Sequence, residues 1–243
     1  MRKVNLKMTK VTLKKVEPAG WMPKHEAVAK RAIALAEGVL ADDSADGFLA
    51  KVENARYSQS RFRKDDGTCV QLSPRKIAEV IRTGKERKTE PDNTINLQVR
   101  LKAYAICVPN DCKMGYVLPP DPIITTNLNW INKQVEGSPG GMDPVSVGAH
   151  WLHEWMHVAG FRHKDRRKID REDAPYRVAT LFKEAAKDLA RLQARTVGEE
   201  FSEAWGDAYE EAVDLMIATG TDEFPDDVVP ADDVALEECK PEV

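Results

Sequence analysis

The chain has 243 residues, of which 42% are hydrophobic and 31% charged, and a formal net charge of −4. This length allows one large domain or two small ones, and the composition is that of a soluble globular protein. The acidic balance, with no paired zinc-finger cysteines and no glycine-rich phosphate loop, argues against nucleic-acid binding. No run approaches the ~20 apolar residues that a membrane span needs.

Charge is unevenly spread between the two ends. Residues 1–31 hold nine Lys or Arg against two Glu, and residues 221–243 hold nine Asp or Glu against one Lys. Two interpretations are open: the ends are solvated, or they pair with each other or shield a site. Lysines interrupt residues 4–16, so this stretch is no signal-peptide core. We therefore expect a cytoplasmic protein, or a secreted one if a leader was removed.

The first third of the chain shows three regular segments. Apolar and polar residues alternate at 4–8, which predicts a strand. Pro23 begins a helix with one apolar face. No clear pattern covers residues 48–70. A second helix is expected from the cap and first-position proline at Ser73-Pro74 to Gly84, where glycine tolerates the left-handed conformation.

The rest of the chain alternates between strands and helices. Strands are predicted at 95–103, 116–118 and 123–126. Asp143-Pro144 begins a helix by the same cap-and-proline logic. Amphipathic patterns predict further helices at 178–189 and 201–217. Four cysteines are too few for a disulfide scaffold. Cys107 and Cys112 are compatible either with a disulfide in an oxidising compartment or with free thiols.

Four of the five histidines fall within a stretch of fourteen residues. His153 and His157 are four residues apart, so on a helix both project from one face and can hold one ion. Gly160 can end that helix with positive φ, and the turn can bring His163 back as a third ligand. Three protein nitrogens leave a fourth position open, as in catalytic zinc sites.

Glu154 follows the first of these histidines. A zinc ion lowers the pKa of its water from 15.7 to roughly 7, and a neighbouring carboxylate can take the proton. The three histidines, a zinc ion and Glu154 together predict peptide hydrolysis without a covalent enzyme intermediate. His150 lies one turn earlier on nearly the same face. It either lines the cleft or is a satisfied histidine of a partly buried helix.

Together these residues form the pattern His-Glu-x-x-His-x-x-Gly-x-x-His at 153–163. This pattern resembles the motif of the metzincin zinc peptidases. The resemblance implies an α+β (α/β zincin-like) fold with a mixed twisted sheet, a central active-site helix, packed helices and an extra C-terminal helix. A strand near 123–129 would be the sheet edge that borders the cleft, and a peptide would add to it. The likeness covers about 23–195. We expect a catalytic domain at 1–197 and a C-terminal helix with an acidic tail at 198–243.

The chain departs from the metzincin pattern after the motif. Metzincins carry a methionine in a tight turn beneath the metal. In this chain the first methionine after the motif is Met216, inside a predicted helix. Pro175-Tyr176 stands there instead and resembles a variant of minimal bacterial metzincin-like proteins. By this resemblance Pro175 forms the turn and Tyr176 points its hydroxyl at the metal or the oxyanion, with packing as the alternative. Lys164 matches none of the large named subfamilies.

A second ligand set competes with the first. Glu203 and Asp207 resemble the helix that donates a glutamate ligand in gluzincin peptidases. Choosing Glu203 leaves Gly160 and His163 without a role, so we favour His163. A solvated helix face is the further alternative for Glu203 and Asp207.

The sequence thus predicts a zinc-dependent endopeptidase that holds one Zn²⁺ per chain and acts on a peptide or protein substrate. The predicted ligands are His153, His157 and His163, and the predicted catalytic residues are Glu154 and Tyr176. The alternative is an inactive metal-binding or protein-interaction module on a peptidase scaffold. The sequence indicates neither the substrate preference nor the oligomeric state.

Overall fold

The computed structural model describes residues 9–103, 114–118, 121–136, 143–163 and 170–189. The predictions at 4–8, at Cys107 and Cys112, and throughout 198–243, Glu203 included, lie outside these residues. The first elements are β1 (Lys10–Val16), a 3-10 turn (Pro18–Gly20), α1 (Pro23–Ala41), α2 (Phe48–Asn54), β2 (Arg61–Arg63), β3 (Cys69–Gln71) and α3 (Pro74–Thr83). They are followed by β4 (Thr94–Lys102), β5 (Gly115–Val117), β6 (Ile123–Asn127), α4 (Leu128–Glu136), α5 (Pro144–Ala159) and a helical segment at 174–189.

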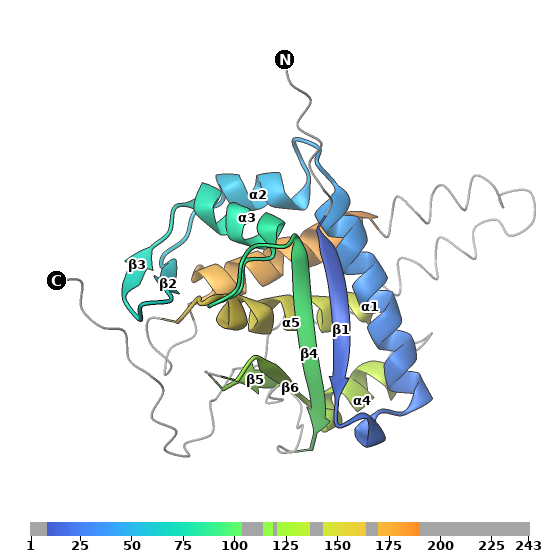
Figure 1. Cartoon of the computed structure of the whole chain (residues 1–243). Coiled ribbons are helices and arrows are strands. Elements are labelled where there is room, and N and C mark those ends of the chain that lie inside the picture. Colours follow the sequence, from blue (N-terminus) through green and yellow to red (C-terminus); the bar gives the residue numbers. More distant parts are fainter. Residues whose placement is uncertain (1–8, 104–113, 119–120, 137–142, 164–169, 190–243) are drawn as a thin grey trace, which may run out of the picture.

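The protein is therefore an α+β fold built on a mixed sheet (Figure 1). The strand order is β1-β4-β6-β5, in which β1, β4 and β6 run parallel and β5 runs antiparallel to β6. β4 has buried side chains at alternate positions, as the sequence predicted for one wet and one buried face.

The expected edge strand near 123–129 is an inner strand. β6 pairs with β4 on one side and with β5 on the other, so β5 is the edge strand at this end of the described sheet. The prediction was wrong because the alternation along a single strand does not indicate which strands lie beside it in the sheet.

Several helix ends agree with the sequence signals. The Ser73 side chain accepts a hydrogen bond from the Lys76 backbone N–H at the start of α3, and Gly84 ends that helix with φ 61°. The Asp143 side chain accepts from the Val145 N–H, 2.9 Å away, at the start of α5. These bonds satisfy N–H groups that have no partner within the helix.

The region at 48–70, which the sequence left unassigned, contains α2 and an antiparallel β2–β3 hairpin. Cys69 on β3 is disulfide-bonded. Among the described residues, no helix is both long and apolar enough to cross a bilayer.

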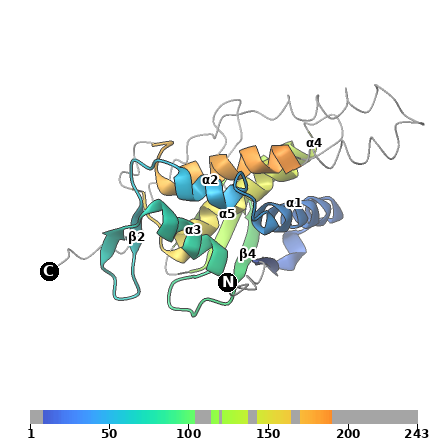
Figure 2. The same cartoon turned by 90° about the horizontal axis from the view of Figure 1, so that it is seen from above.

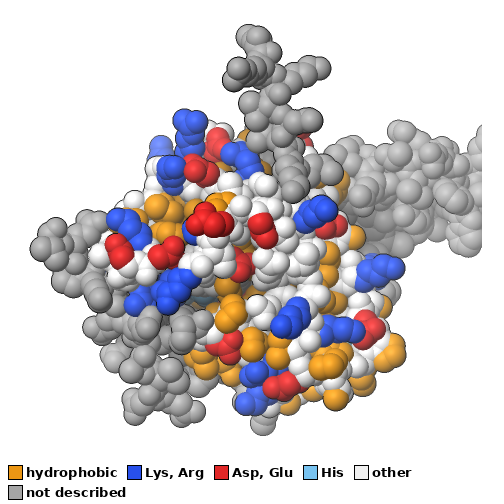
Figure 3. Space-filling model, viewed as in Figure 1, with side chains coloured by type: hydrophobic (Ala, Val, Ile, Leu, Met, Phe, Trp, Pro, Cys, Tyr) orange, Lys and Arg blue, Asp and Glu red, His pale blue; other side chains and the backbone are white. Residues whose placement is uncertain are grey.

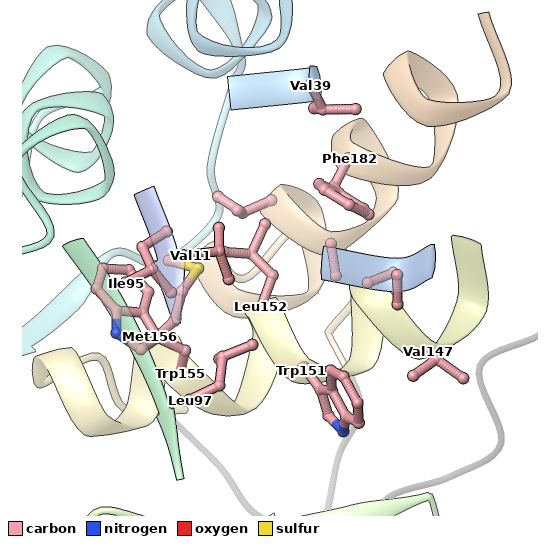
Figure 4. Close-up of a cluster of buried hydrophobic side chains, with 14 of the residues drawn as sticks. Val11, Val39, Ile95, Leu97, Val147, Trp151, Leu152, Trp155, Met156 and Phe182 are labelled. Carbon is pink, nitrogen blue, oxygen red and sulfur yellow. The ribbon is translucent and has the colours of Figure 1, made fainter. Parts of the chain in front are cut away.

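The core lies between the sheet and the helices behind it (Figures 1 and 2). α5 crosses behind the sheet and is buried on nearly all sides, which is why almost its whole surface is apolar. Figure 4 shows the contact region, where β1 and β4 meet α5 and residue Phe182 of the 174–189 helix. Its labelled side chains include Val11, Ile95, Leu97, Trp151, Leu152, Trp155 and Met156. This packing holds α5 in place on the sheet.

The surface shows no segregation of charge on the face seen in Figure 1. There, acidic and basic side chains of the described residues are interspersed (Figure 3). Such a mixed face gives no strong field of one sign.

Candidate metal centre

The first two histidines of the motif are placed by α5. His153 and His157 lie one turn apart on the helix, and their ring centroids are 5.0 Å apart. His153 is 2% exposed, whereas His157 is half-buried. Since α5 is fixed on several sides by the core, the two rings are held on a rigid element.

The third histidine is brought back by the turn at Gly160. Gly160 ends α5 with φ 128°, a conformation that L side chains rarely adopt. A Cβ at this position would also lie 2.8 Å from the Arg63 carbonyl oxygen. The turn places the His163 ring 5.3 Å from that of His153 and 4.6 Å from that of His157. Ligand nitrogens of the three histidines all lie within 4.8 Å of one another.

The rings of His157 and His163 are each oriented by a hydrogen bond on the protein side. His157 Nδ1–H donates to the Phe161 carbonyl at 3.0 Å, and His163 Nδ1–H donates to Asp173 Oδ2 at 2.8 Å. A neutral imidazole that donates from one nitrogen presents the lone pair of the other, so these partners fix which nitrogen can bind an ion.

Burial and the neighbouring histidines favour the neutral form of His153. Desolvation, together with the neighbouring His157 and His163, lowers the pKa of His153 well below 6.5. His153 is thus neutral at physiological pH, which is the protonation state that metal ligation requires. Three imidazole nitrogens that converge in this way are a donor set that fits zinc, with one coordination position left for another group.

Glu154, the predicted base, is also buried at 2% exposure. Its Oε1 lies 3.8 Å from Nδ1 of His150, four residues earlier on α5. The structure therefore brings Glu154 and His150 together on the helix that carries the first two histidines.

Tyr176 lies against the histidine rings. Its ring is stacked on that of His163 at 4.9 Å and lies 4.6 Å from that of His153. Pro175 belongs to the first turn of the 174–189 helix and so does not form an irregular turn of its own. The ring contacts of Tyr176 support the packing alternative; a role for its hydroxyl stays a prediction.

Two contributors to the site carried no signal strong enough to be found in the sequence. Asp173 is 2% exposed and holds His163, but a single aspartate ten residues after a histidine has no recognisable pattern. The other is the segment 58–63. This segment contributes through backbone hydrogen bonds. Almost any side chain is compatible with such bonds, so they leave no sequence pattern.

The segment 58–63 hydrogen-bonds to both ends of the connection that carries His163. The four backbone bonds, each 2.9 Å, are Arg63 N–H to Gly160 O, Arg162 N–H to Arg61 O, Ser58 N–H to Glu172 O and Ala174 N–H to Gln59 O. The Phe62 ring also meets the Phe161 ring edge-on at 5.1 Å. A segment one hundred residues away thus holds the two ends of this connection close together.

Comparisons of the chain with protein-family models, with curated proteins and with solved structures found no match.

Proposed function

We propose that the protein is a zinc-dependent endopeptidase with one Zn²⁺ per chain, held by His153, His157 and His163. The observation that carries this proposal is the convergence of the three ligand nitrogens within 4.8 Å, next to a buried glutamate on the same helix. The metzincin-like spacing of the motif supports the same conclusion. His163 already completes a three-nitrogen cluster, which favours it over Glu203 as third ligand.

The chemistry follows from the positions of the chain's own groups. A bound zinc ion would polarise the scissile carbonyl and acidify a water molecule. Glu154 takes the proton of that water and later gives it to the leaving amine, as a general base and then a general acid. The three histidines would hold the ion through their ring nitrogens. Tyr176 keeps the rings of His153 and His163 in place by packing against the first and stacking on the second.

We also propose where the substrate lies. β5 has one strand neighbour, β6, among the described strands, and α5 packs against both strands. An extended peptide can add to a sheet edge through main-chain hydrogen bonds, and at β5 it would run beside the strand that meets α5 at His150. The disulfide at Cys69 is typical of an oxidising compartment, so we favour the secreted alternative for the protein's location.

The test compares Glu154→Ala with Glu184→Ala, an exposed glutamate on the 174–189 helix. We expect all three proteins, wild type included, to retain about one zinc per chain by mass spectrometry. Cleavage of unfolded casein should fall by roughly 10²–10⁴-fold in Glu154→Ala alone, because a positioned acid–base group contributes about that much. Undiminished cleavage by Glu154→Ala would contradict the mechanism.

The ligand set has its own test. Zinc content should be lost in His163→Ala and kept in Glu203→Ala. The opposite result would favour the gluzincin-type site. Zinc binding without any cleavage by the wild-type protein would favour the inactive metal-binding module.

A further inference from the structure

His150 is a buried histidine that the proposed reaction does not yet use. It lies on α5 with 1% of its surface exposed. Its ring meets that of Trp130 on α4 edge-on at 5.2 Å. On another side it touches β5 so closely that a Cβ at Gly115 would come within 2.5 Å of Nε2. The ring is therefore fixed between α4, α5 and the end strand of the sheet.

The polar groups on the two sides of the His150 ring bear on which of its nitrogens carries the proton. Trp151 Nε1–H donates to Thr126 Oγ1 at 3.0 Å, since an indole nitrogen can only donate. The Thr126 hydroxyl proton is then available for Nε2 of His150, 3.4 Å from Oγ1. Burial lowers the pKa of His150 to about 3, so the ring is neutral at physiological pH. When Nε2 accepts this hydroxyl proton, the single ring proton is on Nδ1, the nitrogen that lies 3.8 Å from Glu154 Oε1.

That proton faces Glu154. The distance from Nδ1 to Glu154 Oε1 is 3.8 Å, and both side chains are almost fully buried. This separation is longer than a hydrogen bond, but the attraction between an N–H dipole and a carboxylate is strong where water is excluded. The i, i+4 spacing on one helix keeps the two groups next to each other.

We propose that His150 is a positioning residue for Glu154: its Nδ1–H, set by Thr126 and Trp151, orients the glutamate carboxylate. This inference rests on the proposed peptidase function. A glutamate side chain has three rotatable bonds, so its carboxylate samples many orientations unless a neighbour restricts it. A catalytic group has to be held close to its productive geometry, and a neutral donor does this without adding a charge to the cation site.

The test uses two neutral amides that replace different halves of the imidazole. In His150→Asn, the amide group lies near the position of Nδ1 and can still donate to Glu154. In His150→Gln, the amide reaches the position of Nε2 and keeps the Thr126 contact instead. His150→Leu removes both. For each variant we would measure zinc content, the absorption spectrum of the cobalt(II)-substituted protein, and kcat and KM separately on a peptide substrate.

We expect zinc content and the cobalt spectrum to match the wild type in all variants, because His150 does not bind the ion. In His150→Gln and His150→Leu, kcat should fall by roughly 10–100-fold with little change in KM, the usual size for residues that orient a catalytic group. His150→Asn should keep most of the wild-type kcat.

Each other outcome overturns the inference. If His150→Gln keeps kcat while His150→Asn loses it, the Thr126 contact matters and His150 has a structural role. Equal losses in the two amide variants would point to packing. The amide pair remains decisive even if His150→Leu does not fold. Wild-type protein that binds zinc and cleaves nothing would remove the proposed function and this inference together, whereas an active wild type with unchanged kcat in every variant removes the inference alone.

Discussion

The two halves of the metal centre are held in different ways. His153 and His157 stand on one helix whose sides are fixed by the core, so the spacing of the two rings follows from helix geometry. His163 lies beyond the helix and depends on the Gly160 turn, the bond to Asp173 and the pairing with residues 58–63. The helical half is a local property of the chain, and the loop half is an assembly of distant parts.

This difference predicts where the site can be weakened. Changes that unfold the core should remove the helical half together with the whole domain. Changes around the turn should lower metal affinity while the domain stays folded, because each affects a few contacts and leaves the packing between the sheet and α5 in place. Three experiments separate the two halves.

Acid should have the largest effect, and it acts on the buried helical half. The pKa of His150 is lowered to about 3 by burial in the folded protein, against about 6.5 when unfolded. The unfolded state therefore binds more protons between these values, and stability falls as the pH drops below 6.5. At pH 4.5 the metal-free protein should lose on the order of 3 kcal/mol through His150, and His153 adds a loss of the same sign.

Urea denaturation of the metal-free protein at pH 7 and pH 4.5 measures this loss. The His150→Asn variant is the control, since it lacks the titrating ring and should show a shallower pH dependence. Equal slopes for wild type and variant would mean that His150 is protonated in the folded state.

Substitution of Asp173 should have the next largest effect, and it acts on the loop half. Asp173→Asn keeps the side-chain shape but removes the charge that holds His163 Nδ1–H. Zinc affinity should fall by roughly 10–100-fold, which is typical for a partner of a metal ligand. Competition with a chelator measures the affinity, and Asp188→Asn, at an exposed carboxylate of the 174–189 helix, should leave it unchanged. Equal affinities in the two variants would show that Asp173 does not support the ligand.

Gly160→Ala should have the smallest effect, and it tests the turn itself. An alanine at φ 128° is strained and its Cβ would approach the Arg63 carbonyl, so we expect a loss of about 1–2 kcal/mol in unfolding free energy. Zinc affinity should also fall, because His163 follows the turn. Ser73→Ala, which removes the cap of α3, should cost a similar ~1 kcal/mol and leave zinc affinity unchanged. A Gly160→Ala protein with wild-type affinity would show that the turn does not position His163.

The success of the sequence-based predictions follows the same division. The cap at Ser73, the cap at Asp143 and the alternation along β4 were all predicted, because each depends on neighbours within a few residues. The position of β6 was not, because the order of strands depends on pairing between segments that are distant in sequence. The hairpin at 61–71 was also missed, since its strands are too short to show a period.

The sequence by itself determined the chemical content of the site: two histidines at helical spacing, a glutamate beside the first, and a glycine able to turn the chain toward a third histidine. Helix periodicity and the φ preference of glycine are local, so they can be read from single positions. The tertiary structure decided which backbone holds that turn, that Asp173 orients His163, and that α4 and β5 enclose His150. Some of these contacts join segments more than one hundred residues apart, and backbone pairing and close packing leave no signature at a fixed spacing.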